Sequence, residues 1–301
     1  MSTTAIYSKE ELVLALNKAL RGKSVPENYK AAITSGDGDG ALQVPTDLHA
    51  YVLQEKKNFK SMKQYVDVIP VKTESGTHAE DDTSQLAELF EINEDFPEIT
   101  EQDIKFKGMK WEIKPYASFT QVPDSLFRDA KYDLFEIFKR SHAERATITE
   151  NKLIFKAVKT LTPKALVDTA ALSTSLNKDL NPAYEKEILI VTNQDGFEVL
   201  KTHGQFLSDG EGPNLKYYFD KYLVEVYDNA TLPTVTGNAP VLYGSFKRGV
   251  KFFDAEKVDI LLKDYPFGIR VPVHAMRGIE AFDVKLIPGT KDVLYGQIPT
   301  T

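Results

Sequence analysis

A short apolar run followed by a polar turn contains the residues best placed for chemistry. Residues 188–191 are typical of a buried strand, and Thr192–Gly196 supply turn residues before helical spacing begins at Phe197. Such a junction can hold catalytic groups at the carboxyl end of a strand, so Asn193 and Asp195 are candidates for that role. The alternative is that they accept hydrogen bonds from the first N–H groups of the helix. This capping role is the commoner one and is favoured here.

Other residue types that often carry chemistry do not occur at useful spacings. The chain has five histidines and no cysteine, and no two histidines stand at the i,i+4 or short-loop spacing that metal sites favour. The segment Gly244-Ser245-Phe246 lacks the glycine that precedes the serine in a nucleophile elbow. The sequence therefore predicts no catalytic triad, no metal site and no cofactor.

Two polar stretches have some features of ion-binding loops. One stretch contains five acidic residues that could bind calcium: Glu80, Asp81, Asp82, Glu94 and Asp95. It lacks the alternating ligands and central glycine of an EF-hand loop, so a solvated or partner-facing surface is favoured. The glycine-rich stretch 36–40 is followed by no Lys-Ser/Thr pair that would hold a phosphate, and we interpret it as a hinge.

The composition describes a folded protein. The 301 residues are 42% hydrophobic and 11% aromatic, which is enough for the cores of roughly two domains. The absence of cysteine excludes disulfides and fits a reducing cytoplasm. A net charge of −7 argues against a protein whose main role is to grip nucleic-acid phosphates. No apolar run approaches the roughly 20 residues of a membrane span and no signal peptide is evident, so we expect a soluble protein.

The first element of the chain needs a partner. The pattern predicts one short amphipathic helix within residues 1 to about 23, in which Leu12 and Leu16 share one face. A helix this short is marginal alone, and the hinge at 36–40 separates it from the rest of the chain. We therefore expect an N-terminal arm that docks elsewhere, including on another subunit.

A highly charged insert lies between two predicted strands. Residues 65–71 and 104–113 alternate as strands do, and ten acidic residues lie between positions 80 and 103. The alternation changes phase at Gly108, which predicts a bulge or bend. We expect an extended hairpin that contacts a partner rather than its own core. Complementary charges for this contact come from Glu80, Asp81, Asp82, Glu94, Lys105, Lys107 and Lys110.

The second half of the chain mixes helices with strands. The longest predicted helix is capped by Asp124 and reaches about Phe155, and a further helix is expected to begin at Thr162-Pro163. Six strands are predicted after the junction at Asn193: 222–227, 241–245, 250–253, 258–262, 269–274 and 279–287. The fold class predicted is α+β.

Several segments, taken in order, resemble the major capsid proteins of tailed bacteriophages. The fold of that family, the Hong Kong 97-type capsid fold, also occurs in encapsulin shells. The matching segments keep their order across roughly residues 40 to 290. They are Gly40–Pro45, Val66–Pro70, Pro115–Ala130, Ile190–Phe197, Ser208–Gly210, Tyr243–Gly249 and Arg277–Phe282.

The resemblance implies a division of the chain into an arm, a loop and two domains. The peripheral domain carries a long spine helix, and the axial domain gathers around five-fold and six-fold axes. The implied segments are an N-terminal arm (1–45), peripheral segments (46–65, 114–159 and 251–301), an extended loop (66–113) and an axial domain (160–250). Asn193, Asp195 and Gly196 would shape a junction inside the axial domain.

The resemblance also implies a structural protein that is not an enzyme and binds no cofactor. Copies would assemble as pentamers and hexamers into an icosahedral shell around double-stranded DNA, without sequence-specific binding and without a membrane. The loop of each subunit would lie over its neighbour. Scaffolding and portal proteins, with decoration proteins as optional partners, are implied too, as are assembly in the host cytoplasm and a final location in the virion.

Two alternatives stay open from the sequence. An encapsulin-like compartment has the same fold but encloses enzymes, and an α/β enzyme would use Asn193 and Asp195. Some family members cross-link the shell covalently, a weld formed by an isopeptide bond between a loop lysine and an asparagine near the C-terminal part of the peripheral domain. The chain has no asparagine after Asn238, so we expect no weld. Fewer than 45 residues precede the first matching segment, so either the chain is already processed or, as Met1 favours, scaffolding is a separate protein.

Overall fold

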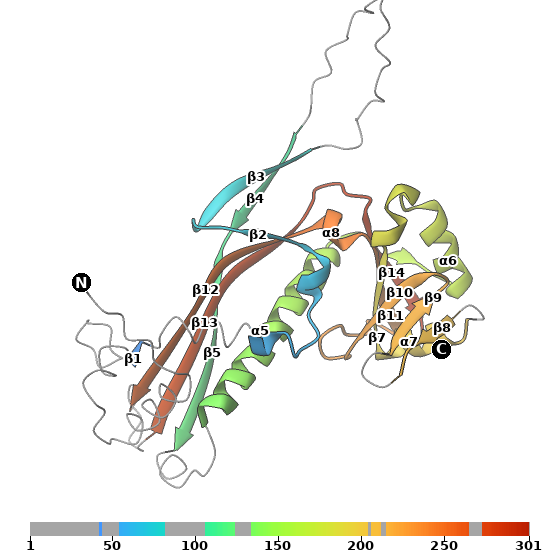
Figure 1. Cartoon of the computed structure of the whole chain (residues 1–301). Helices are drawn as coiled ribbons and strands as arrows, with labels where there is room; N and C mark the ends of the chain where they lie inside the picture. The colour runs from blue at the N-terminus through green and yellow to red at the C-terminus, as the bar shows by residue number, and fades with distance from the viewer. Residues whose placement is uncertain are drawn as a thin grey trace, which may run out of the picture. The chain divides into compact units, whose positions relative to one another are not determined.

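The computed structural model combines helices with strands, in agreement with the α+β prediction. It describes residues 42–43, 54–81, 106–123, 134–203, 206–211, 215–264 and 273–300 (Figure 1). The predicted arm with Leu12 and Leu16 lies outside the described residues, as do Asp82, Glu94 and Lys105. The chain divides into two compact units.

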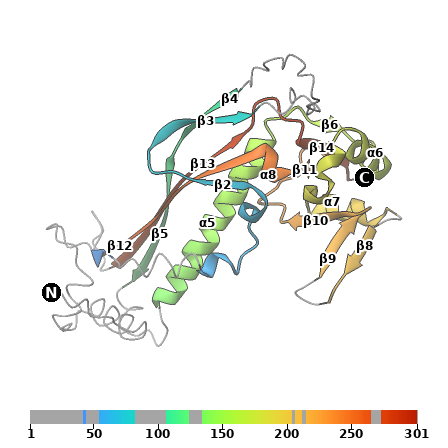
Figure 2. The ribbon, with the colours of Figure 1, turned by 45° about the horizontal axis from the view of Figure 1, so that its top comes forward.

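Unit 1 is built from long strands and most of one long helix. It comprises Met1–Ser61, Lys114–Glu150 and Ala255–Ala281. Three long strands lie side by side in Figures 1 and 2: β12 (Val250–Asp264), β13 (Val273–Leu286) and β5 (Lys114–Pro123). The short strand β1 (Leu42–Gln43) pairs antiparallel with β12, with Leu42 opposite Leu262. Helix α5 (Leu134–Val158) runs along the strands in both views.

The sequence of α5 accounts for its position. Buried small and apolar residues recur at helical spacing, among them Ala143, Ala146 and Ile154. Exposed residues such as Arg140 and Glu144 alternate with them. One face of the helix therefore packs against the protein and the other faces solvent. The helix ends at Val158, slightly beyond the predicted end, and residues 124–133, which include the predicted cap Asp124, are outside the described part.

A seven-stranded sheet dominates unit 2. This unit comprises Met62–Ile113, Asn151–Asp254 and Phe282–Thr301. The strands follow the order β6 (Lys164–Ala165), β14 (Val293–Pro299), β11 (Asn238–Gly244), β7 (Leu189–Asn193), β10 (Tyr222–Tyr227), β9 (Lys216–Phe219) and β8 (Phe206–Asp209). β7 is central, parallel to β10 and antiparallel to β11.

The predicted strand at 188–191 becomes the buried centre of that sheet. Every residue of β7 is buried, which fits its continuous apolar run. Helices α6 (Thr169–Lys178) and α7 (Gln194–Lys201) supply apolar residues to the same core, including Leu172, Leu176 and Leu200. The short helix α8 (Phe246–Gly249) and the 3-10 helices η1 (Met62–Tyr65) and η3 (Pro182–Glu187) complete the unit.

The charged hairpin forms with a pairing that differs from the predicted one. Strand β4 (Phe106–Glu112) pairs with β3 (Ser75–Asp81), a segment that the sequence had placed within the polar insert. The expected partner, β2 (Asp67–Pro70), pairs parallel with β12 instead. The predicted bulge at Gly108 is wrong, because the register runs one-to-one along the whole of β3 and β4.

Packing at the base of the hairpin explains the change of apolar phase at Gly108. Met109 and Trp111 are buried with Phe253, and the rings of Trp111 and Phe253 stack at 5.4 Å. Gly76, opposite Trp111, leaves room for the indole, since a Cβ there would lie 2.5 Å from it. The base of the hairpin therefore does pack on the core of unit 2, contrary to expectation.

Two further predictions about the second half are wrong. No helix begins at Thr162-Pro163, because Lys164 and Ala165 are extended and pair with β14. The helix starts at Thr169, where the Asp168 carboxylate caps it by accepting from the Ala171 N–H at 2.7 Å. The strands expected at 250–253 and 258–262 are one strand, β12, because β2 pairs with its first part and β1 with its last. Strands β5, β8, β9 and β14 were not predicted.

Replacing Gly244 by alanine is expected to destabilise unit 2 by about 3 kcal/mol. Gly244 has a φ of 129°, and a Cβ there would lie 2.1 Å from the Asp292 carbonyl oxygen. Gly289→Ala is the matched control, since its φ is 68° and its Cβ would meet nothing within 4 Å. We expect it to cost about 1 kcal/mol. Urea unfolding of unassembled subunits measures both, and equal midpoints would contradict the clash.

Candidate functional site

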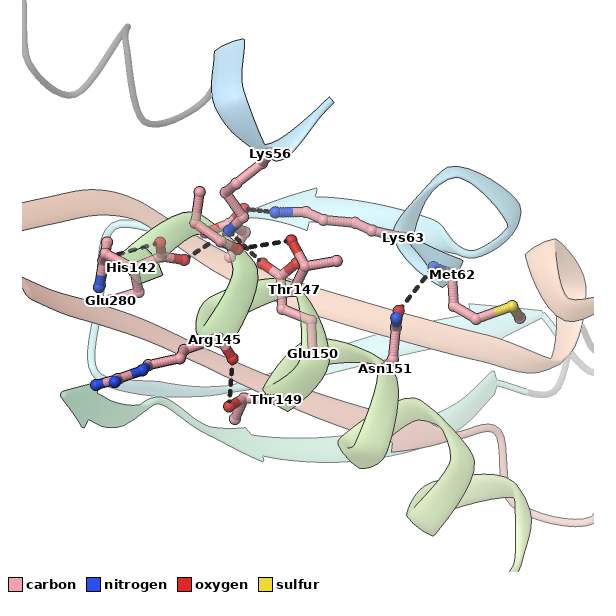
Figure 3. Close-up of polar contacts among 12 residues, drawn as sticks. Lys56, Met62, Lys63, His142, Arg145, Thr147, Thr149, Glu150, Asn151 and Glu280 are labelled. Carbon is pink, nitrogen blue, oxygen red and sulfur yellow. Dashed lines mark hydrogen bonds and ion pairs between the residues drawn. The ribbon is translucent and has the colours of Figure 1, made fainter. Parts of the chain in front are cut away.

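A buried cluster of charged and polar residues lies in unit 1 and joins four segments. Lys56 comes from the helical segment 54–56, Ser118 from β5, His142 and Glu150 from α5, and Glu280 from β13. We call these residues the Lys56 cluster, and Figure 3 shows four of them close together. Its members are up to 224 positions apart in the sequence.

Direct polar contacts hold the Lys56 cluster together. Lys56 Nζ donates to Glu150 Oε1 and to Glu280 Oε2, each at 2.7 Å (Figure 3). His142 Nε2 lies 3.3 Å from Glu280 Oε1. On the other side of the imidazole, His142 Nδ1 and Ser118 Oγ share a hydrogen bond of 2.5 Å. The result is a chain of contacts from a hydroxyl through an imidazole and a carboxylate to an ammonium group.

Burial makes these charges depend on one another. Burial alone raises the pKa of Glu280, but its close contact with His142 and the charge of Lys56 outweigh it and lower the pKa to about 2. Burial lowers the pKa of Lys56, but Glu150 and Glu280 together raise it above its ordinary value. Both groups are therefore charged at neutral pH. The glutamate contribution to stability is present above about pH 4.5 and is lost as the pH falls toward 2.

The local sequence makes space for the cluster. His142 and Glu150 are on the buried face of α5, beside apolar residues such as Ala143 and Ile154. Gly278 on β13 lies against the imidazole, and a Cβ there would come within 2.4 Å of His142 Cε1. Any side chain at position 278 would displace the histidine.

Ser118, His142 and Glu280 contact one another in that order, and these are the residue types of a hydrolase triad. The surroundings argue against that chemistry. His142 is only 3% exposed, and its Nε2 faces Glu280, which also binds Lys56. A catalytic imidazole must reach a substrate, whereas this one is enclosed between β5, β13 and α5. The cluster is best explained as a buried ionic network that joins these elements.

The predicted junction after β7 forms a second polar network, in unit 2. Asn193 is the N-cap of α7, and its Oδ1 accepts from the Gly196 N–H at 2.9 Å, which confirms the capping prediction for this residue. Its Nδ2 donates to Thr234 Oγ1 at 2.7 Å. The Asp195 carboxylate instead accepts hydrogen bonds from Thr234 and Asn229, which lower its pKa.

The same network explains Gly196. A Cβ at this position would lie 2.1 Å from Thr192 Oγ1, so only glycine fits between α7 and β7. Thr192 Oγ1 in turn donates to the Pro240 carbonyl at 2.9 Å. Hydrogen bonds of Asn193 and Asp195 with Thr234 join α7 to the loop before β11.

The structure brings some of the predicted contact residues together. Glu80 lies opposite Lys107 in the β3–β4 register, and Asp81 lies opposite Phe106. Lys110 is exposed on the same hairpin, opposite Thr77. Glu80 and Lys107 are thus opposite each other in the backbone register of one hairpin, and their role in contacts between subunits stays a prediction.

The Lys56 cluster was not predicted from the sequence. Its one sequence signal is the set of polar residues on the apolar face of the long helix: Lys139, His142, Glu150 and Asn151. Within the described part of the chain, no group of three or more metal-ligating side chains could hold an ion. Nor does any described helix have the length and apolarity needed to cross a membrane.

Comparison with protein families identifies the chain. The model of the phage capsid family matches residues 40–288. The chain belongs to the phage capsid family. No curated protein sequence matches this capsid-family chain significantly.

Solved structures show that this capsid-family chain has a capsid fold. The capsid of a native GTA particle aligns with a TM-score of 0.58 at 12% identity, over 88% of this chain and 94% of that one. A structure of Microbacterium phage Oxtober96 aligns with a TM-score of 0.55 at 11% identity, over 91% and 98%. The SrpI encapsulin of Synechococcus elongatus PCC 7942 aligns with a TM-score of 0.54 at 8% identity, over 80% and 88%.

Replacing Lys56 by methionine is expected to lower the free energy of unfolding by about 3–5 kcal/mol, because two buried carboxylates lose their cation. The variant should also lose less stability than the wild type between pH 5 and pH 2. Lys201→Met is the control, since it breaks an exposed pair with Glu198 and should cost less than about 1 kcal/mol. Urea titrations at several pH values test this, and equal losses for both variants would contradict it.

Replacing Asn193 by alanine is expected to lower the free energy of unfolding by about 1–2 kcal/mol, because the cap of α7 and the bond to Thr234 are lost. Combined with Asp195→Ala, the effect should be less than additive, because both residues bind Thr234. Asn177→Ala removes an exposed amide that donates only to the Ser173 carbonyl, and should change stability by less than about 0.5 kcal/mol. Additive effects would argue against a shared network.

Proposed function

We propose that the chain is the major capsid protein of a tailed double-stranded DNA bacteriophage. Copies assemble as pentamers and hexamers into the icosahedral head that encloses the genome. The observation that carries the proposal is the family match from residue 40 to residue 288, a span that covers large parts of both units. The capsid folds of a phage and of a GTA particle support it.

The segments of the chain take the roles that this function requires. Residues 1–45 are an arm and 66–113 an extended loop, which lies over a neighbouring subunit. The axial domain, 160–250, gathers around the symmetry axes and contains the junction at Asn193, Asp195 and Gly196. The peripheral domain comprises 46–65, 114–159 and 251–301. The strands around β7 support the axial domain, and the paired β3–β4 strands support the loop. Strand β14 (Val293–Pro299) belongs to the same sheet as β7, so this sheet does not support the peripheral assignment of the last residues.

The loop residues make the contacts between subunits. Glu80, Asp81, Asp82 and Glu94 supply negative charge, and Lys105, Lys107 and Lys110 supply positive charge. Leu12 and Leu16 contribute an apolar face from the arm. The exposure of Lys110 and the register of Glu80 with Lys107 support a role at the surface. These contacts fix the register between neighbours.

The protein has no catalytic role in this proposal. Its two buried polar networks bind their own side chains, as in the contact of Lys56 with Glu150 and Glu280. Assembly takes place in the host cytoplasm with scaffolding and portal proteins, and the product is part of the virion. Decoration proteins are optional partners.

A cellular compartment is the second candidate. The encapsulin likeness, with a TM-score of 0.54, is nearly as strong as the phage likeness. The match to the phage capsid family favours the genome-enclosing role. The two functions differ in their gene neighbourhood, because a phage head needs a terminase and a portal.

Electron microscopy of the expressed protein tests the proposal. We expect closed shells, alone or beside the scaffolding protein, and the appearance only of monomers in every condition would contradict it. Boiling the shells in detergent should release single chains, because no asparagine follows Asn238 to form a weld. A ladder of covalent oligomers on the gel would show that the shell is cross-linked.

A further inference from the structure

Strands β5 and β13 present two different faces. Alternate residues of a strand point to opposite sides of the sheet, and Ser118 and Glu280 point toward α5, where they join the Lys56 cluster. The residues between them point the other way, and all of them belong to unit 1. We call this second set the β5–β13 face, and its described members are Ala117, Phe119, Gln121, Arg277, Ile279 and Ala281.

The composition of the β5–β13 face is that of a contact surface. Four of its six residues are apolar, and Arg277 is its one charged member. Phe119 is 49% exposed, Ala117 is exposed and Ile279 is half-buried. A sheet face that stays in water normally carries polar residues at the outward positions. The β5–β13 face therefore needs an apolar partner.

The predicted N-terminal arm has the complementary properties. Leu12 and Leu16 share one face of its amphipathic helix, and a helix this short is marginal until that face is buried. Glu10 and Glu11 precede these leucines directly. Their negative charge complements Arg277, the one charge on the β5–β13 face. The arm thus supplies both the apolar surface and the charge that this face lacks.

The chain that follows the arm is already part of the same sheet. β1 pairs with β12, and the strand order is β1-β12-β13-β5. With neighbouring strands about 4.8 Å apart, the distance across the sheet from β1 to β5 is roughly 14 Å. A flexible chain of about 19 residues, the length between position 23 and Leu42, spans roughly 24 Å. The arm is therefore long enough to lie over the β5–β13 face of its own chain.

We propose that, in the unassembled subunit, the arm packs its Leu12 and Leu16 side against the β5–β13 face of the same chain. The inference goes beyond the proposed function, because it concerns the subunit before it joins a shell. The docked arm shields an apolar surface through which free subunits would otherwise associate. If the proposed function holds, assembly releases the arm for its contacts with neighbours, so an intramolecular contact is exchanged for intermolecular ones.

The acidic insert of another copy is the rival partner of the β5–β13 face. It also contains apolar residues, among them Leu89 and Phe90. However, its ten acidic residues between positions 80 and 103 far exceed the single cation on the face. The arm is tethered to the sheet, which gives it an effective concentration on the order of millimolar, whereas another copy must arrive by diffusion. The arm is therefore the better match in a free subunit.

Pairs of introduced cysteines test the contact, because the chain has none of its own. Leu16→Cys with Phe119→Cys places one thiol on each surface. Leu16→Cys with Ile137→Cys is the matched control, since Ile137 is 56% exposed on α5, which covers the other side of the sheet. Leu89→Cys with Phe119→Cys reports the rival. Dilute, unassembled full-length subunits are oxidised mildly, and gels with peptide mapping separate disulfides within one chain from those between chains.

We expect the pair at 16 and 119 to form a disulfide within one chain about tenfold faster than either other pair, because docking holds its thiols together. A second measurement follows maleimide labelling of Phe119→Cys alone. Adding Leu16→Ser should speed this labelling about tenfold, because one buried leucine is lost. Leu14→Ser is the matched control on the opposite side of the helix, and it should change the rate by less than about twofold.

Several results would overturn the inference. It is wrong if the pair at 16 and 119 oxidises no faster than the control with Ile137, or if the pair with Leu89 oxidises faster. Disulfides between positions 16 and 119 that form only between chains would show that the arm docks on another copy. Equal labelling of the Leu16→Ser and Leu14→Ser proteins would also contradict it. Subunits that form the disulfide within one chain but never form shells support this inference and contradict the proposed function.

Discussion

A single ammonium group between two buried carboxylates constrains unit 1 more than any other contact described. Lys56 reaches Glu150 on α5 and Glu280 on β13, and neither carboxylate is accessible enough for water to replace it. Apolar surfaces can slide past one another at modest cost, but a buried charge that loses its partner costs several kcal/mol. The segment at 54–56, the helix and the strand are therefore fixed in one register. Gly278 and Ser118 then fix the position of His142 within it.

The junction in unit 2 also joins separate segments through polar contacts, but these are hydrogen bonds, which are weaker than buried ion pairs. Asn193 and Asp195 share Thr234, so the start of α7 and the loop before β11 are tied through one hydroxyl. Both networks use groups that could do chemistry elsewhere: a serine, a histidine and several carboxylates. In each network, these groups form hydrogen bonds or ion pairs with one another and not with a substrate. A protein that acts by assembly needs such rigidity, because the surfaces it presents to its neighbours must keep their geometry.

Local signals in the sequence were sufficient where one segment determines its own structure. The apolar run at 188–191, the cap at Asn193 and the strand at 222–227 were predicted because neighbours in sequence decide them. Prediction failed where pairing between strands that are distant in the sequence determines the structure. β12 continues through an expected break because β2 and β1 pair with its two parts, and β4 stays regular at Gly108 because β3 is its partner. The Lys56 cluster could not be predicted, since its members are far apart in the sequence.

The uneven distribution of charge links the folded subunit to its assembly. Ten of the 44 acidic residues lie between positions 80 and 103, while the outward face of α5 exposes four cations and one carboxylate. Concentrating like charges is unfavourable in an isolated chain, because they repel one another. In a closed shell the same arrangement is useful, since each surface meets a different partner: a neighbouring subunit or the solvent. The rigid polar networks keep the geometry of these surfaces constant, which directional assembly requires.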